Sequence, residues 1–340
     1  MTTIREALDS VLAGRSLGES EIRAVFDQIL EGGAPPALVA GLLVALRLKG
    51  EEPHELAGGV RALLARARPL ELDGDELLDT AGTGGDGKGT FNISTAAALI
   101  AAAAGVKVAK AGNRAASGTV GAADVLERFG VRIELDPPAL RRCLKEAGIC
   151  FVFAPYYHPA VARVAPIRKE LGIRTLFNLL GPIANAARPM RRLVGVAEPR
   201  TAPVMAQALL ELGARHALVV HSEDGMDEIS PCAPTTMFEV RGGAVTERRI
   251  RPADFGVQGA SAAAMMVENP DQAVAMLCAA LGGESGEAFD VVSLNGGAAI
   301  YAGGAARSLQ EGVEAARAVV RQGLALKTLE RLRAASREEE

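Results

Sequence analysis

The sequence has no tryptophan, and aromatic residues of all kinds make up only 4% of its 340 residues. So few aromatic side chains leave little material for the base-stacking surfaces that bind single-stranded nucleic acids. An excess of positive charge is also missing, because 37 lysines and arginines against 41 aspartates and glutamates leave a net charge of -4. Nucleic acids and anionic membranes select basic surfaces. We therefore expect no nucleic-acid partner and no membrane partner.

Closely spaced cysteine pairs and long apolar runs are absent as well. Cys143, Cys150, Cys232 and Cys278 form no C-x-x-C pair, which favours reduced thiols in a cytoplasmic protein. The first residues carry charges where a signal peptide would be apolar. The longest apolar run, residues 96–106, falls short of the roughly 18 residues that span a bilayer, so we expect it to form a buried helix.

The pattern of hydrophobic residues changes near residue 70. Residues 1–70 have helical periodicity and no strand-like runs, whereas residues 75–335 alternate short apolar runs with longer helical segments. The short runs are residues 77–80, 106–109, 150–153, 193–196 and 217–220. This alternation is typical of α/β folds. The sequence therefore predicts a small all-helical N-terminal domain and a large α/β domain with a mainly parallel central sheet.

Glycine is abundant, with 38 residues, and many of them follow the first predicted strand. Residues 82–95 read GTGGDGKGTFNIST and lead into an alanine-rich helix. Ligands of open parallel sheets bind at the carboxyl ends of the strands, and a helix start offers free N–H groups to an anion. Ser94 and Thr95 are residue types that cap helices. The segment therefore predicts a phosphate-binding loop.

Two common phosphate motifs fit this loop only in part. Gly82, Gly84 and Gly87 satisfy the dinucleotide pattern G-x-G-x-x-G, but the helix begins later and the required acid, about 20 residues on, is missing. Gly82 and Gly87-Lys88 satisfy most of a Walker A loop, but Gly89 stands where serine or threonine would meet magnesium. The hypothesis of a dinucleotide-dependent oxidoreductase is therefore supported only by these three glycines.

Charged residues elsewhere suggest a metal site and an anion site. Glu223, Asp224, Asp227 and Glu228 follow the last predicted parallel strand, and Mg²⁺ takes one or two carboxylates together with water and substrate phosphates. A solvated acidic turn is the alternative interpretation. Arg168 lies on a predicted helix, where its guanidinium could bind a carboxylate through two hydrogen bonds or could simply face solvent.

Several ordered motifs together resemble the anthranilate phosphoribosyltransferases of tryptophan biosynthesis. They are GTGGD at 82–86, NIST at 92–95, KAGNR at 110–114, APYYHPA at 154–160, RTLFNLLGP at 174–182 and DGMDE at 224–228. The resemblance covers nearly the whole chain. It implies transfer of the phosphoribosyl group from phosphoribosyl pyrophosphate to the amine of anthranilate, with N-(5-phosphoribosyl)anthranilate and pyrophosphate as products.

The resemblance also implies the residues of the site. Phosphoribosyl pyrophosphate would be bound by Gly82, Gly85, Asp86, Thr90, Asn92, Ile93, Ser94, Thr95, Lys110, Ala111, Gly112, Asn113, Arg114, Ala115, Ala116, Ser117, Gly118 and Ala122. Anthranilate would be bound by Gly82, Asn113, His158, Arg168, Gly181 and Pro182. Two Mg²⁺ ions are implied, with Asp227, Glu228 and Ser94 as their protein ligands. No dedicated catalytic residue is expected; Arg114 and Asn113 would assist positioning.

The resemblance further implies a homodimer that forms through the small domain, to which helices near residues 160–190 would return. The chain departs from the family pattern at Ala111, where the family commonly has histidine, and at residues 117–120, where a serine-rich segment is reduced to SGTV. Three alternatives stay open: a related phosphoribosyltransferase, a pyrimidine-nucleoside phosphorylase with a different acceptor, and a non-catalytic binding member of the same fold. The Asp227-Glu228 pair argues against the last.

Overall fold

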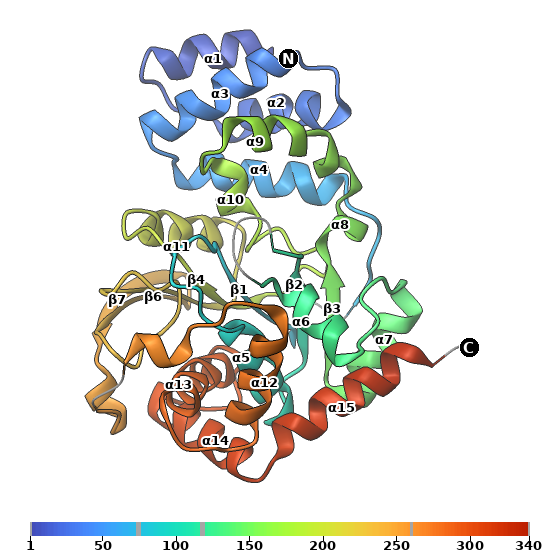
Figure 1. Cartoon of the computed structure of the whole chain (residues 1–340). Coiled ribbons are helices and arrows are strands. Elements are labelled where there is room, and N and C mark those ends of the chain that lie inside the picture. Colours follow the sequence, from blue (N-terminus) through green and yellow to red (C-terminus); the bar gives the residue numbers. More distant parts are fainter. Residues whose placement is uncertain (1, 73–75, 116–119, 259–260, 339–340) are drawn as a thin grey trace.

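The computed structural model describes residues 2–72, 76–115, 120–258 and 261–338. A group of helices from the N-terminal part of the chain lies at one end of the molecule, and a central sheet with its covering helices forms the rest (Figure 1). The predicted fold class, a small helical N-terminal domain with a large α/β domain around a mainly parallel sheet, is confirmed.

Four helices form the N-terminal group. They are α1 (Ile4–Leu12), α2 (Glu19–Glu31), α3 (Pro36–Lys49) and α4 (Pro53–Ala65). Local sequence explains their ends: Thr3 and Glu6 form a reciprocal capping box at the start of α1, and α3 and α4 each begin with proline, which needs no intrahelical N–H partner there. Gly32 ends α2 with φ +80°.

Short helices from the middle of the chain pack on this group. They are α8 (Ala154–Tyr157), the 3-10 helix η2 (Pro159–Arg163), α9 (Ala165–Leu171) and α10 (Leu176–Leu180). Helix α9 contacts α3, and α10 contacts α3 and α4. The rings of Phe26 and Phe177 lie 5.2 Å apart. Apolar side chains of this group form one continuous core with Val194 and Val219 on one face of the sheet. The predicted domain boundary at residues 70–75 therefore stays a prediction. Residues 73–75 lie outside the described ranges.

The sheet has the order β3-β2-β1-β4-β5-β6-β7. Its strands are β1 (Leu78–Gly82), β2 (Val108–Gly112), β3 (Ile149–Phe153), β4 (Arg191–Gly195), β5 (His216–Ser222), β6 (Thr235–Arg241) and β7 (Ala244–Ile250). Strands β1 to β5 are parallel to one another, whereas β6 pairs antiparallel with β5 and β7 pairs antiparallel with β6. The chain runs outward from β1 to β3 and then returns to place β4 on the other side of β1. In sheets of this kind ligands bind at the carboxyl ends of the strands beside such a reversal.

Helices cover both faces of the sheet. Helix α11 (Thr201–Glu211) lies on the face toward the N-terminal group, in contact with α4 and β5. The other face carries the second large core, which includes α5 and α13. The remaining helical elements are α5 (Ile93–Ala103), α6 (Ala122–Phe129), α7 (Pro137–Ala147), η3 (Pro252–Phe255), η4 (Ala262–Met265), α12 (Pro270–Leu281), α13 (Glu287–Ala302), α14 (Leu309–Arg321) and α15 (Leu324–Arg337).

The predicted apolar helix is α5, and its alanines are buried on all sides. It begins at Ile93 with Asn92 as its N-cap, so Ser94 and Thr95 lie in the first turn and do not cap it, contrary to what their residue types suggested. Within the ranges that the structure describes, no helix combines the length and the apolar character needed to cross a bilayer.

Candidate active site

The carboxyl ends of β1 and β4 lie side by side, in the place where open α/β sheets bind ligands, and we call this place the crevice. Gly82 and Gly195 are paired in the parallel register, and the N–H of Thr83 donates to the carbonyl of Gly195 at 2.9 Å. The acidic loop after β5 packs directly on both strand ends. A Cβ at Gly195 would lie 1.5 Å from the carbonyl oxygen of Asp227, and one at Gly82 would lie 2.5 Å from its Oδ2. Both positions therefore need glycine.

We expect Gly195→Ala to push the acidic loop off the strand ends. The clash is with backbone, which cannot turn aside as a side chain would, so we expect the free energy of unfolding to fall by roughly 2 kcal/mol. Urea unfolding followed by circular dichroism measures this loss. Gly33→Ala is the matched control, because a Cβ there meets nothing within 4 Å. Equal unfolding midpoints for the two variants would contradict the packing argument.

The glycine loop is attached to its surroundings near its start and near its end. Near its start, the N–H of Gly84 donates to Oδ2 of Asp227 at 2.8 Å. Farther along, the N–H of Val267 donates to the carbonyl of Gly89 at 2.8 Å, and that of Phe91 to the carbonyl of Met265 at 3.1 Å. The loop is therefore a shaped part of the crevice, which suits backbone N–H groups that must meet a phosphate.

The start of α5 carries polar atoms that lack partners. The Thr95 hydroxyl and Oδ1 of Asn92 are buried and form no hydrogen bond within the described part of the chain, while the Asn92 amide nitrogen donates to the carbonyl of Val120 at 3.3 Å. Buried polar atoms without partners are rare in folded proteins. Beside the free N–H groups of a helix start, they suit an anionic ligand such as a phosphate.

Three carboxylates concentrate negative charge at this edge. Burial, together with the nearby Asp86 carboxylate, raises the pKa of Asp227 to about 6. Burial and the Asp227 carboxylate raise the pKa of Glu228 well above its usual value. Such mutual repulsion is relieved by a divalent cation. Among the described residues, no group of three or more His, Cys, Asp or Glu side chains is placed to hold a metal ion.

The other two acids of the loop have structural partners. Glu223 is exposed and accepts two hydrogen bonds from Arg249, at 2.6 and 3.0 Å, and these hold its pKa below the usual value. Asp224 accepts from the hydroxyl of Ser230 at 2.7 Å. That Asp227 and Glu228 are the metal ligands of this loop stays a prediction.

Lys110 lies beneath the crevice and is buried. Its Nζ donates to the carbonyl of Thr80 at 2.6 Å and to Oγ of Ser94 at 3.2 Å. Burial lowers its pKa, while the carboxylates of Asp79 and Glu228 raise it. The contact with Ser94 orients the hydroxyl that the resemblance assigns to a magnesium ion. In this structure Lys110 thus acts on the site through Ser94.

A buried polar group under Lys110 escaped the sequence analysis. Oδ1 of Asp79 accepts from the N–H of Ala111 at 3.0 Å, and Oδ2 accepts from the amide of Asn185 at 2.9 Å. The guanidinium of Arg192 lies 3.6 Å from the same carboxylate. These contacts join β1, β2 and β4 below the glycine loop. The available signal was an aspartate within an otherwise apolar strand.

The segment after β2 is held close to α6. Asn113 Oδ1 accepts from the N–H of Arg114 at 2.7 Å, and the guanidinium of Arg114 pairs with Glu127, with one N···O distance of 2.9 Å. A Cβ at Gly121 would lie 2.4 Å from the N of Ala115. The contacts of Asn113 and Arg114 with a donor stay predictions. Of the predicted donor-binding residues, Ala116, Ser117 and Gly118 lie outside the described residues.

Four of the six residues predicted to bind anthranilate come from the segment between β3 and β4, and Gly82 and Asn113 lie at the ends of β1 and β2. Arg168 on α9 is partly buried, lies 5.5 Å from the Phe177 ring and has no carboxylate within 4.0 Å in the described ranges. Burial lowers its pKa. His158 is buried, and its pKa is likewise lowered by burial. Gly181 ends α10, and the carbonyl of Pro182 lies 3.5 Å from the guanidinium of Arg192. Arg168 therefore offers a guanidinium ready for a carboxylate.

Comparisons with known proteins identify the family. Residues 5–67 match the glycosyl transferase family helical bundle domain, and residues 74–326 match the glycosyl transferase family a/b domain. Anthranilate phosphoribosyltransferase of Thermomicrobium roseum is 48% identical over 337 residues, which cover 98% of this chain and 97% of that protein. The enzyme of the same name from Rubrobacter xylanophilus is 48% identical over 338 residues, covering 98% of each. The chain belongs to the anthranilate phosphoribosyltransferase family.

Solved structures agree with this assignment. Anthranilate phosphoribosyltransferase from Thermus thermophilus has a TM-score of 0.92 and 44% identity, over 98% of this chain and 99% of that one. The Saccharomyces cerevisiae enzyme in complex with PRPP and Mg shares the fold, with a TM-score of 0.89 and 24% identity over 98% and 97% of the two chains. Family membership confirms the resemblance seen in the motifs, and with it the predicted enzyme class.

Arg174 is a further residue of this family site whose role the sequence analysis did not identify. Its guanidinium donates to the carbonyl of Gly84 and, at 3.3 Å, to that of Thr83. Its Nε lies 3.9 Å from the carboxylate of Glu198, and the same carboxylate forms a salt bridge with Arg47 at 2.6 Å. Arg174 thus ties the glycine loop to helix α3 of the N-terminal group. Arg174 is the first residue of the motif at 174–182, but its position before a helix did not predict which groups its side chain contacts.

We expect Arg174→Ala to raise the KM for phosphoribosyl pyrophosphate. Without its two donated hydrogen bonds the loop carbonyls can turn, so the loop N–H groups lose their alignment at a cost of about 1 to 2 kcal/mol, or roughly 5- to 30-fold in KM. Steady-state kinetics with varied donor measures the change. Arg200→Ala is the matched control, since Arg200 pairs with the same Glu198 at 3.3 Å. A donor KM that is equal in both variants would contradict this role.

Proposed function

We propose that this chain transfers the phosphoribosyl group of phosphoribosyl pyrophosphate to the amine of anthranilate in the crevice at the carboxyl ends of β1 and β4. The observation that carries the proposal is the meeting of the glycine loop with the Asp227-Glu228 pair, through the hydrogen bond between Gly84 and Asp227 at 2.8 Å. This arrangement puts anion-binding N–H groups and cation-binding carboxylates within one site, as a magnesium-bound pyrophosphate requires.

We propose that the donor phosphates are bound by the glycine loop, the first turn of α5 and the segment from Lys110 to Ala122. Two Mg²⁺ ions would be held by Asp227 and Glu228 and by the Ser94 hydroxyl, which Lys110 orients at 3.2 Å. Bound Mg²⁺ would neutralise pyrophosphate charge as it develops on the leaving group. The loop N–H groups provide fixed hydrogen-bond donors to the same oxygens, and such preorganised electrostatic stabilisation is usually the largest contribution to catalysis.

Arg168 is the residue on which the proposed binding of the acceptor, anthranilate, depends. We propose that its guanidinium binds the anthranilate carboxylate and so points the amine at C1 of the ribose, with Asn113 near the amine. The amine lone pair then forms the new C1–N bond, the C1–O bond to pyrophosphate breaks with its electron pair on pyrophosphate, and the amine proton is released. An aromatic amine is itself the nucleophile, so the step depends mainly on positioning. His158, with its pKa lowered by burial, would line the acceptor pocket as a neutral group.

Two further proposals concern assembly and location. We propose a homodimer formed through the N-terminal helices, which is supported by Leu12 and Leu48, whose side chains are 70% and 81% exposed on α1 and α3. Exposed large apolar residues often mark an interface. Light scattering should give twice the chain mass of 35.2 kDa. We also propose a cytoplasmic location, which agrees with four cysteines that are all free thiols in the structure.

The decisive experiment follows anthranilate fluorescence with phosphoribosyl pyrophosphate and Mg²⁺ present. We expect a magnesium-dependent loss of fluorescence that stops when a chelator is added. If fluorescence is stable while another amine is consumed, Ala111 has changed the acceptor, and if a nucleoside is cleaved with phosphate instead, the nucleoside phosphorylase alternative holds. Absence of every reaction, with the donor still bound, would favour a binding protein of the same fold.

A further inference from the structure

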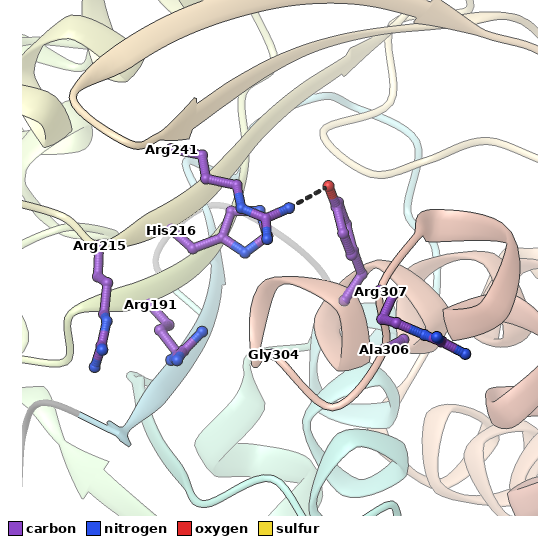
Figure 2. Close-up of a pocket in the computed structure, with 8 residues that line it drawn as sticks. Arg191, Arg215, His216, Arg241, Gly304, Ala306 and Arg307 are labelled. Carbon is purple, nitrogen blue, oxygen red and sulfur yellow. Dashed lines mark hydrogen bonds between the residues drawn. The ribbon is translucent and has the colours of Figure 1, made fainter.

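A strongly basic cavity lies at the end of the sheet where β4 and β5 begin, opposite the crevice. It has a volume of about 340 Å³ and is lined by Arg191, Arg215, His216, Arg241, Tyr301, Gly304, Ala306 and Arg307 (Figure 2). Arg191 begins β4 and His216 begins β5, whereas the crevice lies where these two strands end. The cavity is therefore separated from the crevice by the length of the strands and is no part of the site described above.

The lining of this cavity contains four guanidinium groups and no carboxylate. Two of the four guanidiniums have acidic partners, since Arg215 pairs with Glu76 at 3.3 Å and Arg307 pairs with Glu311 at 3.4 Å. The Glu239 side chain is buried. It accepts hydrogen bonds from Nε2 of His216 at 3.0 Å and from the hydroxyl of Tyr301 at 2.6 Å. Among the described residues, Arg191 and Arg241 have no carboxylate within 4.0 Å, so the excess of positive charge in the cavity wall comes from these two. Burial lowers the pKa of His216 and the guanidiniums of Arg241 and Arg191 lower it further, although its bond to Glu239 raises it.

The position of Arg191 is built into the backbone. A Cβ at Gly304 would lie 2.6 Å from its Nη1, so glycine at this place makes room for the guanidinium. Nη1 donates to the carbonyl of Ala302 at the end of α13, at a long 3.4 Å, and Nε is buried and has no partner within the described residues. Arg241 donates to the hydroxyl of Tyr301 at 3.1 Å (Figure 2). These two guanidiniums are held in place and retain unused donors.

We propose that this cavity binds a small molecule that carries a diphosphate group. Its volume of about 340 Å³ is that of a small-molecule site. Guanidinium groups match phosphate oxygens through paired hydrogen bonds. Because Arg215 and Arg307 are largely exposed, with side-chain exposures of 59% and 93%, their attraction is weakened by solvent, and tight binding requires a ligand with several negative charges close together. A diphosphate meets that requirement, whereas a single carboxylate or monophosphate neutralises only part of the wall.

Calorimetric titration of the full chain with inorganic pyrophosphate tests this site. The titration is done with a chelator present, because without Mg²⁺ the carboxylates of the crevice repel phosphates. We expect saturable binding that weakens at least tenfold in Arg215→Gln with Arg241→Gln, two exposed residues that can be changed without disturbing the core. Arg141→Gln, an exposed arginine on α7, removes charge elsewhere and should leave the dissociation constant unchanged.

A second titration uses ADP to distinguish two sources of the diphosphate. Tighter binding of ADP than of pyrophosphate identifies a nucleotide site, and tighter binding of pyrophosphate identifies a site for the free anion. Either result supports the proposal if the double variant loses it. Binding that survives the double substitution, or that weakens equally in Arg141→Gln, overturns the proposal, and so does the absence of saturable binding. Arg307→Gln, whose side chain is 93% exposed, repeats the test in a variant that poses no risk to the fold, with an expected two- to threefold weakening.

Discussion

Replacing Asp227 by Asn together with Glu228 by Gln is expected to lower kcat/KM for phosphoribosyl pyrophosphate by about 100- to 1000-fold. The two carboxylates are the proposed Mg²⁺ ligands, and without them the charge that develops on pyrophosphate is poorly neutralised. Burial and mutual repulsion already raise the pKa of both groups, so the uncharged amides should not destabilise the metal-free fold. The measurements are the magnesium dependence of the rate and the thermal midpoint of the metal-free protein.

A matched control lies in the same loop. Glu223→Gln removes one negative charge of this loop, from an exposed side chain that pairs with Arg249 and is assigned no ligand. Its magnesium dependence should equal that of the unaltered protein. A double variant with normal turnover at low Mg²⁺ would show that Asp227 and Glu228 are not the metal ligands. A double variant that unfolds at a much lower temperature would instead show that the pair has a structural role.

Arg168→Ala should separate acceptor binding from donor binding. Removing a guanidinium that pairs with a carboxylate in a partly buried place costs about 2 to 4 kcal/mol, or roughly 30- to 1000-fold in affinity. The carboxylate forms and breaks no bond in the reaction, so the loss should be seen mainly as a raised KM for anthranilate. Donor affinity, measured by calorimetry, should hardly change, because the phosphates are assigned to the glycine loop and to the segment after β2.

The neighbouring Lys169→Ala provides the control, since Lys169 is exposed on the same helix and is assigned no contact. Its anthranilate KM should match that of the unaltered protein. If Arg168→Ala loses donor affinity and retains its KM for anthranilate, then Arg168 is a phosphate ligand and the proposed division of the crevice is wrong. An equal loss in both variants would indicate a general charge effect of α9.

Much of the α/β architecture could be predicted because its signals are local. All five predicted apolar runs form the parallel strands β1 to β5, and the alanine-rich run forms α5. Strands β6 and β7 were missed, because β7 is mostly exposed and has no apolar run. A signal for this hairpin was available in Gly242-Gly243, whose φ values of +60° and +80° suit the tight turns that connect antiparallel strands.

The site was predicted unevenly for a similar reason. The glycine loop and the Asp227-Glu228 pair each stand at the end of a strand, and parallel topology alone predicts that such segments meet. Lys110 also stands on a strand, but its burial under Ser94 depends on the packing of β1 against β2. Arg174 reaches the glycine loop from a separate segment, and no periodicity or spacing indicates that contact.

The sequence by itself determined the alternation of strands and helices, the glycine-rich loop that follows the first strand, and, through ordered motifs, the family. These follow from residue type and from spacing along the chain, which local backbone preferences translate directly into structure. The tertiary structure alone decided which charges have a partner. Arg114 forms a salt bridge with Glu127, and Asp79 accepts a hydrogen bond from the amide of Asn185. Arg191 and Arg241 line a cavity whose lining contains no carboxylate. Electrostatic energies depend on distance in space and on burial, and neither quantity can be read along a chain.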